Sequence, residues 1–363
     1  MEIGSGSVEN MVDLAVWKVF KGKRIFLTGH TGFKGSWLAL WLNELGAHVS
    51  GFSLPAPAVS LFRQAAVADI CTHVEGDVRD LPGLQAALHA ASPEVVFHLA
   101  AQPLVREGYR RPVDTWGSNV MGTVNLLEAV RHCPPVRAVV IVTTDKCYDN
   151  REWFWGYREN DNLGGDEPYS ASKAACELAA ASYRKSFLDK AGVLVSTARA
   201  GNVIGGGDYG EDRILPDVYR SILAHIPLHV RQPESVRPWQ HVLCALHGYL
   251  LLAAGLLEGR RELARAFNFG PAREDSTSVR RLLEALREHW PELKWTADMR
   301  EDNPHEAGML RLDASLARSV LGWTPHWNLA HTVRRTAEWY RQTLVCPEQA
   351  LNLCREQIKE YMV

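Results

Sequence analysis

Segments that read as strands alternate with segments of helical periodicity along the first 200 residues. Strand-like runs occur at 24–27, 48–53, 73–77, 94–100, 138–144 and 193–200. Apolar positions recur at helical spacing over 37–45, 119–131 and 169–187. Because strands that alternate with helices build parallel sheets, we expect an α/β fold with a doubly wound parallel sheet.

The pattern changes after residue 200. Residues 205–210 are too rich in glycine for a regular element. Short strands are then predicted at 228–231 and 266–269, and helices at 242–257, 278–289, 314–321 and 329–344. These elements predict a smaller C-terminal α/β substrate domain, interleaved with late elements of the sheet domain.

The expected domain limits follow from these changes. Residues 1–20 form a flexible leader, and residues 21–200 form the sheet domain, which also receives elements from about 235–270. Residues 201–363 form mainly the substrate-binding domain. A chain of 363 residues suits two units, because single cores stop growing at about 250 to 300 residues.

Charge and composition exclude several classes of function. The net charge is −2 and no block of Lys or Arg is present, which argues against nucleic acid as a partner. The longest apolar run, 249–257, is shorter than the roughly 18 residues that cross a membrane. The polar start 1–7 lacks the pattern of a signal peptide, so we expect a cytoplasmic protein. Seven cysteines without CxxC spacing indicate reduced thiols and no metal site.

A glycine-rich turn, Thr28–Gly35, joins the first strand to the first helix. Gly29 permits a tight turn, Gly32 allows a pyrophosphate to approach the backbone, and Gly35 allows the helix to pack on the strand. On its own the pattern is weak, and a glycine turn without a ligand would be an equally good interpretation. Its place between a strand and a helix favours dinucleotide binding.

Tyr169 and Lys173 are four residues apart on a predicted helix and therefore share one face. A cation there favours the phenolate, which can take a proton from a sugar hydroxyl, and the lysine reaches the nicotinamide ribose. An isolated pair of this spacing is more often a surface tyrosine and lysine. The position after the fifth strand of a sheet that begins with a glycine motif favours the catalytic interpretation.

Together, four motifs resemble the short-chain dehydrogenase/reductase superfamily. They are the glycine turn, Asp77–Val78 after the third strand, Ala100–Gln102 after the fourth, and the Tyr169 and Lys173 pair. The chain length and the segment 312–325 are similar to the extended branch, whose members modify nucleotide sugars.

The resemblance implies a Rossmann domain that binds NAD. In the family, the acid after the third strand touches the adenine and the turn after the fourth strand lines the cofactor. The implied cofactor-binding residues are Gly29, Thr31, Gly32, Phe33, Lys34, Gly35, Ser53, Asp77, Val78, Ala100, Ala101, Gln102, Asn119, Thr143, Tyr169 and Lys173. Ser53 stands where NAD enzymes usually carry an acid for the ribose, so we expect NAD to be held less tightly than in relatives with an acid.

The end of the fifth strand narrows the reaction that the resemblance implies. Thr144, Asp145 and Lys146 lie where nucleotide-sugar 4,6-dehydratases carry Thr-Asp-Glu. In those enzymes the threonine orients the sugar 4-hydroxyl, the aspartate protonates the departing 6-hydroxyl, and the glutamate removes the C5 proton. Lys146 replaces the glutamate, which leaves open whether it is the base or a charged stabiliser. The implied catalytic residues are Tyr169, Lys173, Thr144, Asp145 and Lys146.

Further segments are similar to the subfamily of these dehydratases that acts on CDP-D-glucose. The segments are 28–38, 100–106, 144–150, 155–159, 199–208 and 237–242. The resemblance implies CDP-D-glucose as the substrate and a role in 3,6-dideoxyhexose synthesis for bacterial surface polysaccharides. Gln102, Arg106, Asn202, Arg213 and Arg237 are the implied substrate-binding residues, and arginine suits a diphosphate because its planar donors pair bidentately.

Other interpretations stay open from the sequence. A different nucleotide-sugar 4,6-dehydratase or a 4-epimerase is the nearest alternative, and a non-catalytic NAD-binding scaffold comes from another class. Relatives pair two long helices from each of two chains in a four-helix bundle, so the resemblance also implies a homodimer.

Overall fold

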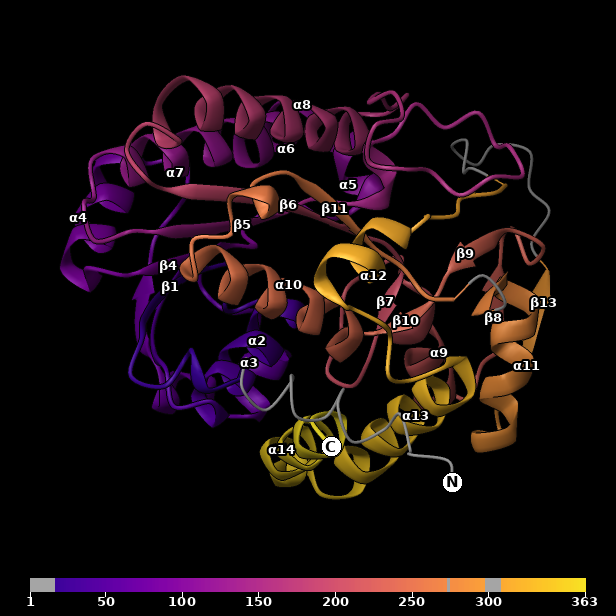
Figure 1. Cartoon of the computed structure of the whole chain (residues 1–363). Helices are drawn as coiled ribbons and strands as arrows, with labels where there is room; N and C mark the ends of the chain where they lie inside the picture. The colour runs from indigo at the N-terminus through magenta and orange to yellow at the C-terminus, as the bar shows by residue number, and fades with distance from the viewer. Residues whose placement is uncertain (1–16, 273–274, 298–307) are drawn as a thin grey trace, which may run out of the picture.

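A seven-stranded parallel sheet forms the centre of the computed structural model, which describes residues 17–272, 275–297 and 308–363 (Figure 1). The strand order is β11-β6-β5-β4-β1-β2-β3, and every pairing is parallel. The strands are β1 (Arg24–Thr28), β2 (His48–Ser53), β3 (Thr72–Glu75), β4 (Val95–His98), β5 (Ala138–Val142), β6 (Leu194–Ala200) and β11 (Ala266–Phe269). The order reverses beside β1, and such a switch point is where ligands bind in open α/β sheets. The predicted fold class is confirmed.

Helices cover both faces of this sheet. One face packs against α4 (Leu81–Ala91), α7 (Gly122–Arg131) and α8 (Pro168–Tyr183), and the other packs against α2 (Phe33–Glu44) and α10 (Val242–Leu257) (Figure 1). All residues of α10 are buried, as expected for a helix whose sequence is apolar on every side. Because both faces are covered, β5 and β6 are buried along their whole lengths.

Short elements complete this half of the molecule. They are α3 (Leu61–Gln64), α5 (Val105–Arg110), α6 (Pro112–Trp116), the π-helical turns η2 (Gly117–Met121) and η4 (Arg184–Leu188), and the 3₁₀ turns η1 (Val67–Ile70), η3 (Asp145–Cys147) and η5 (Arg261–Leu263). Thr143 and Thr144 separate β5 from η3, and this turn carries part of the predicted catalytic triplet.

A smaller lobe lies beyond the carboxyl ends of the strands. It contains three two-stranded sheets, β7 (Val203–Ile204) with β10 (Gln240–His241), β9 (Val236–Pro238) with β12 (Ser276–Ser278), and β8 (Leu228–Val230) with β13 (Trp295–Ala297). Its helices are α9 (Ile214–Leu223), α11 (Val279–His289) and α13 (Leu329–Val345). Of the remaining C-terminal elements, α12 (Ser315–Leu321) packs on β11 and α10, and η7 (Pro347–Gln349) leads to α14 (Ala350–Tyr361), which packs on α2 in the sheet half. The chain returns from this lobe to add α10 and β11 to the sheet half.

The last residues of the segment predicted as a leader, which was expected to end at residue 20, pack on the fold. Trp17 and Phe20 are buried, and the ring of Trp17 lies 5.6 Å from that of Trp41 in α2. The polar start misled the prediction because the two aromatic side chains pack on residues distant in sequence. Residues 1–16 lie outside the described part of the chain. No described helix is both long and apolar enough to cross a membrane.

Candidate active site

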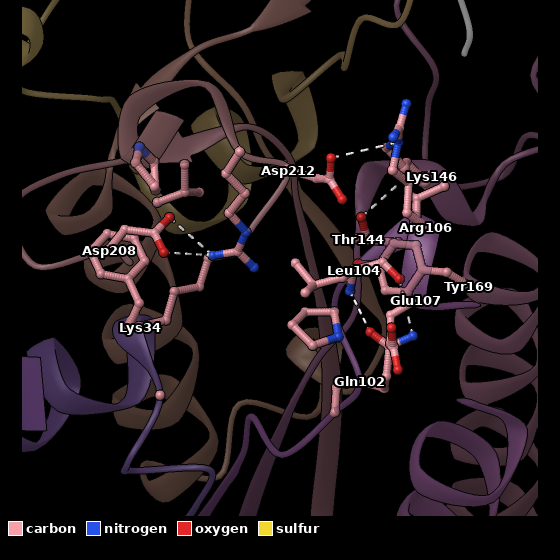
Figure 2. Close-up of a pocket in the computed structure, with 18 of the residues that line it drawn as sticks. Lys34, Gln102, Leu104, Arg106, Glu107, Thr144, Lys146, Tyr169, Asp208 and Asp212 are labelled. Atoms are coloured by element: carbon pink, nitrogen blue, oxygen red, sulfur yellow. Dashed lines mark hydrogen bonds and ion pairs between the residues drawn. The ribbon is translucent and has the colours of Figure 1, made fainter. Parts of the chain in front are cut away.

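A cavity of about 860 Å³ opens between the sheet half and the smaller lobe. Its lining includes the glycine turn, the ends of β4 and β5, α8, β8 with the residues after it, and residues in and beside β9. Figure 2 shows Lys34 and Asp208 on one side of this cavity and Thr144 and Tyr169 on the other. The cavity therefore brings together chemistry-bearing residues from both halves of the chain.

In the glycine turn, two glycines pack closely against backbone atoms and a third lines the cavity. Gly29 has φ +77°, and a Cβ there would lie 2.6 Å from the backbone nitrogen of Ala100. A Cβ on Gly35 would lie 2.1 Å from the oxygen of Gly29, so neither position accepts a side chain. Gly32 lines the cavity at the start of α2, and a Cβ there would meet only the oxygen of Gly29, at 3.4 Å. This arrangement fits a dinucleotide pyrophosphate at the helix N-terminus.

The predicted ribose and adenine residues line one end of the cavity. The hydroxyls of Ser53 and Thr31 are hydrogen-bonded at 2.7 Å, and Thr31 also donates to the oxygen of Leu54. Hydrogen bonds from Arg79 lower the pKa of the Asp77 carboxyl. The carboxylate is therefore held ionised beside the cavity.

Asn119 does not line the cavity, although the sequence resemblance implied a cofactor contact. Its side chain accepts from the backbone nitrogen of Gln102 at 2.8 Å and donates to the hydroxyl of Ser172 at 2.8 Å. It thereby joins the turn after β4 to α8. The amide of Gln102 lines the cavity, and its nitrogen donates to Leu104 and Thr115.

Tyr169 and Lys173 face the cavity from the first two turns of α8. The carboxylate of Glu167 caps this helix by accepting from the backbone nitrogens of Tyr169 and Ser170 at 2.7 and 2.8 Å. The ammonium of Lys173 donates to the oxygen of Val142 at 3.2 Å, which ties the helix to the end of β5. The cap and this bond fix both functional groups relative to the strand.

Burial opposes the phenolate form of Tyr169, which a nearby cation is expected to favour. Burial raises the pKa of Tyr169 above its usual range, although a hydrogen bond with Thr144 and the charge of Arg213 oppose that rise. Burial also lowers the pKa of Lys173. The phenol is therefore the resting form, because desolvation of the anion outweighs the nearby cations.

The catalytic triplet predicted after β5 comes together in η3. The hydroxyl of Thr144 lies 3.0 Å from one carboxylate oxygen of Asp145 and accepts from the backbone nitrogen of Lys146 at 3.3 Å. Asp145 is buried, and its second oxygen has no hydrogen-bond partner among the described residues. A Cβ on Gly201 would lie 1.8 Å from that oxygen, so the glycine makes room for the carboxylate. All three residues of the triplet line the cavity.

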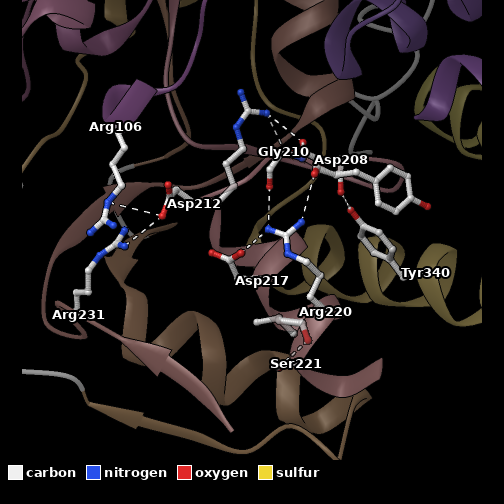
Figure 3. A network of polar contacts seen from close by, with 12 residues as sticks. Arg106, Asp208, Gly210, Asp212, Asp217, Arg220, Ser221, Arg231 and Tyr340 are labelled. Atoms are coloured by element: carbon white, nitrogen blue, oxygen red, sulfur yellow. Dashed lines mark hydrogen bonds and ion pairs between the residues drawn. The ribbon is translucent and has the colours of Figure 1, made fainter. Parts of the chain in front are cut away.

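Arginines and carboxylates form a second polar part of the cavity lining. Asp212 lies between two arginines, 3.6 Å from Arg106 and 3.3 Å from Arg231 (Figure 3). Arg213 contacts both oxygens of Asp208 at 3.1 and 3.0 Å. The side chains in these contacts are only partly exposed, so the cavity wall carries fixed positive charge balanced by the chain's own acids.

The remaining predicted substrate residues also line this cavity. The Arg237 guanidinium donates to the oxygen of Val236 at 2.9 Å, and Asn202 has φ +40°. Sequence reasoning missed Arg231, Asp208 and Asp212. The only local feature of the sequence that could have indicated Arg231 is its position at the end of the predicted strand 228–231.

Lys34 has an electrostatic environment that its glycine motif did not predict. Burial lowers the pKa of its ammonium to about 8, and the charge of Arg213 acts in the same direction. The nearby acids Asp145 and Asp208 oppose this shift. The Lys34 ammonium therefore loses its proton more readily than that of an ordinary lysine, and it lies in the same cavity as Tyr169.

Comparison with known proteins gives concordant results. The family model described as GDP-mannose 4,6 dehydratase matches residues 26–336. The CDP-glucose 4,6-dehydratase of Salmonella typhimurium is 46% identical over 359 residues, which cover 97% of this chain and 99% of that protein. A dTDP-glucose 4,6-dehydratase of Streptomyces antibioticus is 29% identical, covering 87% of this chain and 92% of that protein.

Solved structures match the fold. An epimerase of Methanothermobacter thermautotrophicus superposes with a TM-score of 0.80 at 20% identity, covering 93% of this chain and 98% of the other. A dTDP-glucose 4,6-dehydratase of Bacillus anthracis, solved in complex with NAD, superposes with a TM-score of 0.74 at 20% identity, covering 89% of this chain and 97% of the other.

Proposed function

The chain belongs to the GDP-mannose 4,6-dehydratase family, and from that premise we propose that it converts CDP-D-glucose to CDP-4-keto-6-deoxy-D-glucose and water. The observation that carries this proposal is the meeting of Tyr169 with Thr144, Asp145 and Lys146 at one end of the cavity. The substrate follows from 46% identity, over nearly the whole chain, to a relative named for CDP-glucose.

The residues of the glycine turn fit NAD. Gly32 opens on the cavity, and Ser53, Asp77 and Ala100 line the path from α2 to the strand ends. NAD held by these residues would supply the hydride acceptor for C4 of the sugar and the hydride donor for C6, so the overall reaction would involve no net oxidation. Calorimetric titration of the purified protein with NAD⁺ tests this assignment.

Tyr169 is proposed to accept the proton of the sugar 4-hydroxyl in its phenolate form. The hydrogen bond with Thr144 and the charge of Arg213 both favour that form. Thr144 contacts both Tyr169 and Asp145, so its hydroxyl can orient the sugar between them. These contacts support the role of Thr144 as the residue that sets the position of the 4-hydroxyl.

Asp145 and Lys146 are proposed to assist the loss of water across C5 and C6. The second oxygen of Asp145 is buried and without a hydrogen bond among the described residues, so it is available to carry a proton to the departing 6-hydroxyl. Lys146 lines the same cavity and is proposed to stay charged and to stabilise the enolate that develops on O4. If it instead acts while neutral, it is the base that removes the C5 proton.

The diphosphate of the substrate is proposed to bind the arginine side of the cavity. Arg106, Arg213 and Arg237 line it, and Asn202 and Gln102 lie in the same lining. Guanidinium groups pair bidentately with phosphate oxygens, which gives both affinity and orientation. We therefore expect nucleotide diphosphates to compete with CDP-glucose.

One assay tests the reaction and the substrate together. Purified protein is incubated with CDP-, dTDP-, GDP- and UDP-glucose, and the alkali-induced absorbance of a 4-keto sugar is recorded. We expect strong absorbance with CDP-glucose and weak absorbance with the other three. Preference for another nucleotide would contradict the substrate, an epimerised product would favour a 4-epimerase, and the absence of any product with bound NAD would favour a scaffold.

We also propose that two chains pair through the surface of α6, η2 and α8. Val113, Trp116, Met121 and Leu178 on these elements are exposed by 83, 41, 51 and 62%. Large apolar side chains gathered on neighbouring helices are typical of a protein interface. Light scattering at micromolar concentration should give the mass of a dimer, and Leu178→Glu should give a monomer. A wild-type monomer would contradict the proposal.

The setting of the reaction is proposed on the resemblance alone. We place the enzyme in the cytoplasm, where it would supply a 4-keto-6-deoxy sugar for 3,6-dideoxyhexose synthesis. Loss of that sugar from the surface polysaccharide of a strain that lacks the gene is the expected outcome.

A further inference from the structure

One face of α8 continues beyond the two predicted functional residues. Tyr169, Lys173 and Glu177 follow one another at intervals of four residues, so they lie along the same side of the helix. Each of them contacts the end of β5 or one of the two residues after it. Tyr169 bonds to Thr144, Lys173 to the oxygen of Val142, and Glu177 to the hydroxyl of Thr143.

The Glu177 carboxylate lies at the centre of a buried polar cluster. One oxygen accepts from Thr143 at 2.5 Å, and the other accepts from Thr197 at 2.7 Å and from Arg199 at 2.8 Å. Burial disfavours the charge of Glu177, but Arg199 and the two threonines more than offset it, so the pKa of Glu177 is lowered. The glutamate is therefore ionised inside the protein.

Arg199 extends the cluster to the other side of the catalytic triplet. Its Nη1 donates to the hydroxyl of Tyr148 at 2.8 Å and to the oxygen of Glu159 at 3.1 Å. The Tyr148 hydroxyl in turn donates to Asn268 in β11 at 2.7 Å. Thr143 precedes the triplet and Tyr148 comes two residues after it, so the ion pair reaches both ends of the segment that carries Thr144, Asp145 and Lys146.

From this arrangement we infer that Glu177 and Arg199 are positioning residues, which hold the triplet in register with Tyr169 by fixing Thr143 before it and Tyr148 after it. The inference rests on the proposed dehydration for its effect on turnover. Neither Glu177 nor Arg199 lines the cavity, so both act through other residues.

The burial of the pair argues for such a role. Both side chains are 4% exposed, whereas the pair of Arg213 with Asp208 in the cavity lining includes an arginine that is 33% exposed. A buried ion pair contributes little net stability compared with apolar side chains of similar volume, because desolvation offsets the attraction. Apolar side chains would fill the space but could not hold two hydroxyls at fixed positions. The polar cluster is thus explained better by positioning than by stability.

The test uses two matched variants on the same carboxylate. Thr143→Val and Thr197→Val each remove one hydroxyl that donates to Glu177, from neighbouring buried strands, but only Thr143 adjoins the triplet. Small misplacements of catalytic groups lower rates by up to roughly 10²-fold. We expect kcat to fall about 10- to 100-fold in Thr143→Val with KM within about threefold, and to fall less than about threefold in Thr197→Val at a similar melting temperature.

Thr143 also lines the cavity, so a second variant separates positioning from contact with a ligand. Tyr148 follows the triplet and does not line the cavity, and Tyr148→Phe removes the hydroxyl that accepts a hydrogen bond from Arg199. We expect the same selective fall in kcat. Arg199→Lys, which keeps the charge but loses the planar fork, should also lose kcat, whereas a purely charge-balancing role would leave it close to wild type.

Amide hydrogen exchange gives a readout that does not depend on turnover. The peptide that contains residues 143–148 should exchange faster in Tyr148→Phe than in the wild type and Thr197→Val. Equal exchange and equal kcat in Tyr148→Phe and Thr197→Val would overturn the inference. If the wild type fails to convert CDP-glucose, the proposed function is wrong, and exchange in this peptide still decides whether the ion pair fixes the segment.

Discussion

Two groups of residues in one cavity lining, called the tyrosine end and the arginine end, hold their polar groups by different means. At the tyrosine end, which comprises Tyr169, Lys173 and Thr144–Lys146, side chains are fixed by bonds to backbone atoms and to one another. At the arginine end, the guanidinium groups pair with carboxylates of the same chain, Asp208 and Asp212.

The contrast indicates that one group of residues transfers protons and the other binds the anionic part of the substrate. Groups that move protons work best when they are already in place, because misalignment lowers the rate directly. Groups that bind an anion can instead exchange one anionic partner for another. We expect substitutions at the tyrosine end to act on kcat and substitutions at the arginine end to act on KM, and the following variants test this difference.

Tyr169→Phe should have the largest effect. It removes the proposed general base, whose contribution is typically about 10²- to 10⁴-fold in rate, while leaving the ring in place. Turnover should fall by that amount and CDP-glucose binding should stay within a few-fold, since the phenol acts in the transition state. Steady-state kinetics and calorimetric titration measure both. Tyr183→Phe, at the far end of α8, is the control, and unchanged turnover in Tyr169→Phe would remove the central assignment.

Substitution of Lys146 comes next and separates its two possible roles. Lys146→Arg keeps the charge but cannot act as a base, so a charged stabiliser predicts partial activity in Arg and severe loss in Met. A base predicts severe loss in both variants. We expect the first result, because the acid that precedes Lys146 favours its charged form where the two side chains approach.

Solvent deuterium at C5 provides the direct measurement for Lys146. Product formed in D₂O is analysed by mass spectrometry, and substrate recovered from the same mixture reports exchange without elimination. An Arg variant that oxidises C4 but exchanges no C5 hydrogen would contradict the charged role and identify Lys146 as the base.

Arg213→Gln should affect binding more than turnover. Hydrogen bonds to charged groups contribute about 1.5 to 3 kcal/mol each, which corresponds to a roughly 10- to 100-fold rise in KM for CDP-glucose. A smaller fall in kcat is expected, because the charge of Arg213 also favours the Tyr169 phenolate. Arg220→Gln is the matched control, since Arg220 pairs with Asp217 and does not line the cavity. A fall in kcat with unchanged KM would break the proposed division.

Local patterns predicted the tyrosine end well. The spacing of Tyr169 and Lys173 sets one helix face, and the glycine positions set the turn before α2, so neither needs knowledge of distant contacts. The limits of α10 agree with the prediction because an unbroken apolar helix carries a clear signal in its sequence. The seven-stranded parallel sheet followed from the alternation of strands and helices.

The arginine end was predicted only in part. Arg106, Asp212 and Arg231 come from three segments far apart in sequence, and no periodicity connects them. Asn119 shows a related limit, because a motif gave its position but not the fact that its amide points to Gln102 and Ser172. Helices α9 and α14 were not predicted at all, since their packing depends on distant parts of the chain.

Asp212→Asn should have the smallest effect and the opposite direction. The carboxylate lies between Arg106 and Arg231, and a substrate diphosphate that binds these guanidinium groups must displace it or share them. Asp212 has φ +54°, a conformation that asparagine also adopts readily, so the backbone should keep its path. All three side chains are about one-quarter exposed, and ion pairs in such surroundings contribute little to stability. We therefore expect an unchanged melting temperature and a KM for CDP-glucose that falls about two- to fivefold at low ionic strength. The gain should shrink in 0.5 M salt, because screening weakens the competition.

Glu234→Gln, which neutralises an exposed acid paired with Arg280 outside the cavity, is the control. A KM that rises in Asp212→Asn would mean that the aspartate holds the two arginines in the binding geometry instead of competing with the substrate, and the arginine end would then be as fixed as the tyrosine end.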